Sequence, residues 1–183
     1  GIHGREPWVL TAGSTQPKLL KDINKSDDDG IMGACGSTCI SAAGSRVVIR
    51  TNLAGGELWG SDGTEAGTKV LSFTGISPVN IIRSTSEGTY LTAYSGANQR
   101  LFFADGNSVD ETIMPEASGY TSNPWFDSII QNSSGTYLVA NEGSNSHLFR
   151  ASPPAKPVRL PSAPNTRWHG TMIEIGLCPT AAP

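Results

Sequence analysis

The densest group of chemically capable side chains in this 183-residue sequence is the acidic loop over residues 22–30. Asp22, Asn24, Ser26 and Asp28 alternate along it, so that every second residue offers an oxygen ligand. Ca²⁺ prefers hard oxygen ligands on a flexible loop, which makes these four residues a candidate calcium site. The loop lacks the bidentate glutamate expected downstream, and we interpret it first as a solvated connection, with calcium binding as the alternative.

A second group of candidates is aromatic. Trp168 lies between Arg167 and His169, and a ring flanked by polar donors on a loop could stack on a sugar or a planar ligand. Tyr120 and Trp125 are further candidates of the same kind. Packing inside the fold is the competing interpretation for these aromatic rings.

No local motif predicts a catalytic residue. The three histidines, His3, His147 and His169, are dispersed, and no Gly-x-Ser-x-Gly elbow is present. Asp62 and Asp105 each precede a glycine, and Asp-Gly is ordinary hairpin-turn chemistry. A hydrolase or lyase that uses converging carboxylates remains the alternative interpretation.

Composition excludes two classes of partner. Charged residues are 16% of the chain and the net charge is −3, which leaves no basic footprint for nucleic acid. No apolar run approaches the roughly 18 residues that a membrane-spanning helix needs.

The cysteines bear on the compartment. Cys35, Cys39 and Cys178 do not form a zinc ligand set, so we expect one disulfide and one thiol, with the pairing open. The chain starts at Gly1, as a processed chain would. Together with few lysines and many small polar residues, these features predict a secreted, extracellular or periplasmic protein.

Internal repeats decide the predicted fold. A glycine-initiated apolar run is followed at nearly constant spacing by an apolar-aromatic run and a polar turn. The copies begin at Gly44, Gly88 and Gly135. A fourth copy is split, since 170–176 resembles the first run and 6–13 resembles the second. Further short apolar stretches bring each unit to four predicted strands in about 45 residues, the pattern of a propeller blade.

The sequence therefore predicts an all-β protein, a small propeller of four four-stranded blades in one domain, 1–183. The units are approximately 31–75, 76–118, 124–162, and 163–183 joined with 1–24. Pairing of N-terminal with C-terminal strands would close the ring and remove exposed sheet edges. A piece of a larger propeller, or half of an eight-bladed ring built from two chains, is the alternative. The aromatic column between the blades is Trp8, Trp59, Phe102 and Phe149.

Residues 57–71 resemble the ELWxSDGTxxGT repeat of large bacterial secreted and surface proteins, and residues 4–24 resemble a second, altered copy. That family is generally taken to be β-propellers, so the resemblance implies this fold and a secreted or surface setting. It brings no catalytic residues.

The predicted function is a non-catalytic binding module that recognises a glycan, a small molecule or a protein through the rim or axis of the propeller. A hydrolase or lyase and a structural or adhesive part of a larger surface protein are the alternatives. No cofactor is expected beyond the calcium considered above, and the protein is expected to be a monomer or a homodimer.

Overall fold

The computed structural model describes residues 4–31, 39–51, 53, 57–71, 79–95, 98–112, 125–142, 145–153 and 155–160. All regular structure in these ranges is β, so the prediction of an all-β fold is confirmed. Among the residues described, no helix has the length and apolarity that crossing a membrane requires.

The strands of the described residues form four small antiparallel sheets, which we number in chain order. The first sheet holds β1 (Trp8–Val9) and β2 (Lys18–Leu19). The second holds β3 (Ile40–Ala43), β4 (Arg46–Arg50), β5 (Leu58–Ser61) and β6 (Lys69–Leu71). The third holds β7 (Val79–Ser84), β8 (Thr89–Ser95), β9 (Asn98–Ala104) and β10 (Val109–Glu111). The fourth holds β11 (Trp125–Asn132), β12 (Gly135–Glu142), β13 (Asn145–Ser152) and β14 (Ala155–Arg159).

The second, third and fourth sheets share one topology. In each of them the strands pair in chain order, so that every sheet is a four-stranded meander. Short apolar runs separated by turn residues produce this pattern, because each hairpin closes before the chain can pair elsewhere. Gly63 and Gly106 occupy equivalent turns after β5 and β9, with φ of 87° and 86°, a conformation that glycine adopts without steric cost.

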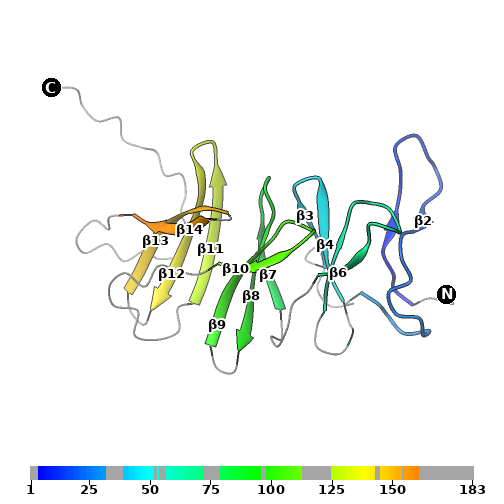
Figure 1. The fold of residues 1–183 in the computed structure, drawn as a ribbon, viewed down its shortest axis with the longest axis horizontal. Coiled ribbons are helices and arrows are strands. Elements are labelled where there is room, and N and C mark those ends of the chain that lie inside the picture. The colour runs from blue at the N-terminus through cyan, green and yellow to red at the C-terminus, as the bar shows by residue number, and fades with distance from the viewer. Residues whose placement is uncertain are drawn as a thin grey trace.

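The sheets stand side by side in a row that begins with the first sheet and ends with the fourth (Figure 1). Within the described ranges this row is open, since the first and fourth sheets lie at its opposite ends (Figure 1). The predicted strands of 163–183, which would complete the first sheet, lie outside the described residues.

Each sheet uses its two faces for different neighbours. We call the face toward the preceding sheet the backward face and the face toward the following sheet the forward face. In the third sheet, Leu91 pairs with Phe102 on the backward face, and Tyr90 pairs with Phe103 on the forward face. The alternation of side chains along a strand thus lets one sheet bury apolar residues on both sides.

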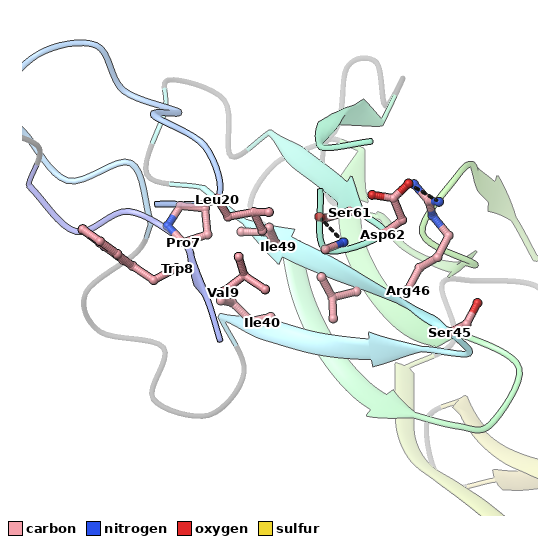
Figure 2. Close-up of a pocket in the computed structure, with 12 residues that line it drawn as sticks. Pro7, Trp8, Val9, Leu20, Ile40, Ser45, Arg46, Ile49, Ser61 and Asp62 are labelled. Atoms are coloured by element: carbon pink, nitrogen blue, oxygen red, sulfur yellow. Dashed lines mark hydrogen bonds and ion pairs between the residues drawn. The ribbon is translucent and has the colours of Figure 1, made fainter. Parts of the chain in front are cut away.

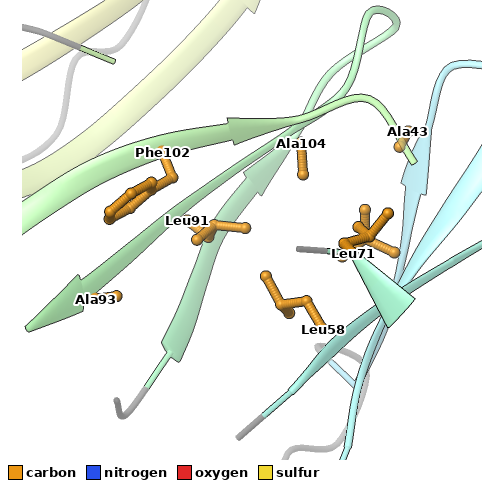
Figure 3. Close-up of a cluster of buried hydrophobic side chains, with 8 residues drawn as sticks. Ala43, Leu58, Leu71, Leu91, Ala93, Phe102 and Ala104 are labelled. Atoms are coloured by element: carbon orange, nitrogen blue, oxygen red, sulfur yellow. The ribbon is translucent and has the colours of Figure 1, made fainter. Parts of the chain in front are cut away.

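Two apolar clusters fill the spaces between the larger sheets. The backward face of the third sheet packs on the forward face of the second (Figure 3). The members are Ala43, Val48, Leu58, Leu71, Leu91, Ala93, Phe102 and Ala104. The backward face of the fourth sheet packs in the same way on the forward face of the third. The members are Tyr90, Leu101, Phe126, Ile129, Leu138, Ala140, Phe149 and Ala151, with Phe103 against them. These clusters hold the sheets face to face.

The predicted packing of the aromatic column between sheets is confirmed for Phe102 and Phe149 and is not found for Trp8. Phe102 and Phe149 are 5% and 0% exposed and lie between sheets. Trp59 is half-buried on the backward face of the second sheet, where it pairs with Ile49. Trp8 is 56% exposed, because none of the described sheets precedes the first and covers its backward face.

Candidate functional site

Of the five aromatic and polar residues predicted to bind a ligand, the structure describes Trp125. It lies at the start of β11 and is 70% exposed, so its ring is available for stacking. Tyr120, Arg167, Trp168 and His169 lie outside the described residues, and their predicted role stays a prediction.

The cysteine pairing likewise stays a prediction. Cys39 is buried next to β3. Its two candidate partners, Cys35 and Cys178, lie outside the described residues.

The acidic loop holds its own turns with the side chains that were predicted to bind calcium. The Ser26 hydroxyl donates to Asn24 Oδ1 at 2.9 Å, and the Asp28 amide donates to the Ser26 hydroxyl at 3.2 Å. Within the described ranges, no group of three or more His, Cys, Asp or Glu side chains is placed to hold a metal ion. The geometry is that of a connection stabilised by short-range hydrogen bonds, and calcium binding at Asp22, Asn24, Ser26 and Asp28 stays a prediction.

Glu6 anchors this loop, a role that sequence reasoning missed. Its side chain is buried, and its carboxylate accepts hydrogen bonds from the amides of Ile23 at 2.8 Å and Asn24 at 3.2 Å. A buried carboxylate needs such partners to offset its lost hydration. Glu6 therefore fixes the loop beside the first sheet.

The Ser-Asp-Gly-Thr segment after β5 is a self-bonded turn. The Thr64 hydroxyl and amide donate to Asp62 Oδ1 at 2.7 and 2.9 Å. The hydroxyls of Ser61 and Thr68 hydrogen-bond at 2.7 Å. Because the hydroxyl and then the amide of Thr64 stabilise the carboxylate, the pKa of Asp62 lies below its ordinary value. The turn interpretation of Asp62 is confirmed.

Arg46 connects this turn to the next sheet. It lies on the forward face of the second sheet, where its Nε donates to the Gly106 carbonyl oxygen of the third sheet at 3.0 Å. Its Nη2 donates to the Gly67 carbonyl oxygen at 3.1 Å, and its Nη1 lies 3.6 Å from Asp62 Oδ2. One guanidinium thus joins the turn between β5 and β6 in its own sheet to the turn between β9 and β10 in the following sheet.

A pocket of about 250 Å³ lies between the first and second sheets (Figure 2). Pro7, Val9 and Leu20 form one apolar wall, and Ile40 and Ile49 belong to the facing one. The Trp8 ring points away from Ile49 (Figure 2). The other described lining residues are Trp8, Ser45, Arg46, Val47, Ser61, Asp62 and Gly63. The two described strands of the first sheet, β1 and β2, correspond to β5 and β6 of the second sheet.

A larger pocket, of about 500 Å³, lies where the third sheet meets the fourth. Its described lining is Glu87, Phe103, Asp105, Ser108, Asp110 and Pro153. Three of these six carry a carboxylate, and no lysine or arginine is among the described lining residues. The described lining is therefore acidic.

Asp105 is the best-held carboxylate of this larger pocket. Its Oδ1 accepts the amides of Asn107 at 2.7 Å and Ser108 at 2.8 Å. Partial burial alone would raise the pKa of Asp105, but the hydrogen bonds from Ser108 and Asn107 outweigh burial and lower it. Asp105 is thus ionised near neutral pH, as an acceptor or counter-ion must be.

The comparison with known proteins is negative at every level. No protein-family model, no curated protein and no solved structure matches this chain.

Proposed function

We propose that the four sheets are blades of a β-propeller. Three of them are meanders of the same topology, and successive sheets bury alternate faces against each other, which is how blades pack. The resemblance of 57–71 to the ELWxSDGT repeats supports the same assignment.

The first blade would be completed by the segment 163–183, whose residues 170–176 resemble the first run of the repeat. These strands would cover the pocket wall that contains Ile40 and Ile49. If the segment comes from the same chain, the ring has four blades and the protein is monomeric. If it comes from a second copy, two chains build an eight-bladed ring. Light scattering coupled to size exclusion separates a 19.2 kDa particle from one of twice that mass.

We further propose that the protein is a secreted or surface binding module without catalytic activity. The observation that carries this proposal is the larger pocket between the third and fourth sheets, whose described lining is acidic and comes from the ends of strands and from turns. Ligand pockets are typically clefts of about 300–1,000 Å³, and this pocket, of about 500 Å³, falls within that range.

The chemistry of Asp62 and Asp105 does not suit the general acid that the hydrolase alternative needs. A general acid of a glycosidase needs a raised pKa. The pKa values of Asp62 and Asp105 are both lowered, and Asp62 is committed to Thr64 and Arg46. These groups suit recognition rather than proton transfer.

An array of glycans, small molecules and peptides tests the proposal. We expect hits whose affinity falls in Asp105→Asn and is unchanged in Glu65→Gln, a substitution at an exposed carboxylate near the first blade. Turnover of an array substrate, or hits that are indifferent to Asp105, would contradict it.

A further inference from the structure

The third strand of each larger sheet carries the same step, a leucine followed by an aromatic residue. Because neighbouring residues of a strand point to opposite faces, the leucine lies on the forward face and the ring on the backward face. At both junctions between these sheets, the ring of one sheet packs in the same buried cluster as the leucine of the sheet before it. The pairs are Leu58 and Trp59, Leu101 and Phe102, and Leu148 and Phe149.

The forward face of the fourth sheet repeats the forward half of these junctions. Leu148 is half-buried there, although its counterparts in the other sheets are buried. Tyr137 is also half-buried, and the register places it where Val48 and Tyr90 are completely buried. Val139 in the middle of this face is buried, so the exposed apolar area surrounds it.

Two more apolar side chains are exposed on the same face. Trp125 pairs with Asn141 and Val158 pairs with Arg150, and both partners share the face of Tyr137. Trp125 and Val158 are 70% and 64% exposed. Among the described sheets, none follows the fourth and covers them (Figure 1).

The backward face of the first sheet offers the complementary half. Trp8 pairs with Leu19 as Trp59 pairs with Val70, so Trp8 is the aromatic ring of this copy. It is more than half exposed, whereas Phe149, at the equivalent position, is completely buried. The row of sheets thus ends in a leucine without its ring on one side and begins with a ring without its leucine on the other.

We propose that the forward face of the fourth sheet binds the backward face of the first sheet in a second copy of this chain. This inference rests on the proposed assignment of the sheets as blades, and it names the partner of the two end blades. Trp8 of the second copy would pack on Leu148, as Phe149 packs in one cluster with Leu101. The contact would continue the two junctions already present in the chain.

The arrangement of the sheets favours a second copy over the chain's own first sheet. The first and fourth sheets lie at opposite ends of the row (Figure 1), and buried apolar clusters hold the three larger sheets face to face. Each copy has four sheets, so two copies joined at both ends have eight. That number lies within the range of about four to eight blades that is typical of propellers.

Sedimentation equilibrium over a range of concentrations tests the proposal. We expect a particle of twice the chain mass of 19.2 kDa. Trp8→Glu and Val158→Glu each bring a charge to the apolar contact and should raise the dissociation constant at least about tenfold. Both residues are more than half exposed, so the fold should tolerate the change. Should a glutamate variant not fold, alanine at the same position replaces it, with a rise in the dissociation constant again expected.

Val70→Glu is the matched control. Val70 is also an exposed apolar residue, but it pairs with Trp59 on the backward face of the second sheet, inside the row. We expect its dissociation constant to equal that of the wild type. A wild-type mass of 19.2 kDa at every concentration, or an equal effect of Val70→Glu, would overturn the proposal.

Mixing the two variants tests the direction of the contact. Trp8→Glu leaves the fourth sheet intact and Val158→Glu leaves the first sheet intact, so one native contact remains possible between them. We expect the mixture to dimerise at a concentration where neither variant does so alone. A mixture that associates no better than either variant would overturn the head-to-tail contact.

The ligand array separates this inference from the proposed function. A monomer that binds array ligands through Asp105 removes the second copy and leaves the binding module standing. A head-to-tail dimer that binds no array ligand supports the contact and contradicts the binding module.

Discussion

Arg46→Met is the substitution that most sharply tests how the second and third sheets are held together. Methionine keeps much of the aliphatic stem and removes the guanidinium. The Gly106 and Gly67 carbonyl oxygens then lose their donor, and each hydrogen bond to a charged group contributes about 1.5–3 kcal/mol. Because water can reach part of this site, we expect a loss below the sum, about 3 kcal/mol.

Urea unfolding followed by circular dichroism measures this loss, and a thermal scan should show a midpoint lower by about 6–12 °C. Arg150→Met is the matched control. Arg150 also donates to a backbone oxygen, that of Ser134 at 3.0 Å, but it is exposed and the bond lies within its own sheet. We expect the control to change the free energy of unfolding by no more than about 0.5 kcal/mol. Equal effects of the two substitutions would refute the role assigned to Arg46.

Three further predictions concern the same junctions. Tyr90→Phe removes a buried hydroxyl without a partner and should leave the ligand-free protein as stable or about 1 kcal/mol more stable in urea unfolding; a clear loss would reveal a partner. Gly60→Ala should destabilise the fold by more than Gly63→Ala, because a Cβ at Gly60 would meet the backbone of Gly106. At Gly63 the space is open, and a side chain would cost only the strain of a φ of 87°, about 1–2 kcal/mol. The reverse order of the two midpoints in thermal unfolding would contradict the packing of the second sheet on the third. Because the pKa of Asp105 is lowered in the folded protein, the ionised carboxylate stabilises the fold above the ordinary pKa of aspartate, and this contribution is lost as the pH falls through the folded value. Asp105→Asn should therefore lose less stability than the wild type below about pH 4 in urea unfolding. The same fall in stability with pH in both proteins would contradict this.

The strands were predictable because their signal is local. Gly44, Gly88 and Gly135 mark the starts of runs that become β4, β8 and β12, and the alternation of side chains follows from strand geometry. The arrangement of the sheets was not predictable in the same way. Whether a row closes depends on the angle between neighbouring sheets, which facing side chains set across the junctions. Trp8 illustrates this, since its sequence position matches Phe102 but its face is uncovered.

The same limit applies to the site. The turns at Asp62 and Asp105 were assigned from two-residue motifs, and their hydrogen bonds agree. The role of Arg46 was missed because its acceptor at Gly106 lies 60 residues away. A signal was present, however. Arg46 is the charged residue in an otherwise apolar run, and a charge on the face that meets another sheet requires a partner.

The central claim is that the sheets are propeller blades and that residues 163–183 supply the strands which the first blade lacks. Hydrogen–deuterium exchange read by mass spectrometry tests it on the unmodified protein. If the segment pairs beside β1, the amides of 170–176 should exchange as slowly as those of β8 and β12, whether the segment comes from the same chain or from a second copy. Exchange of 170–176 at the rate of an unfolded peptide, with β8 and β12 protected, would contradict the account.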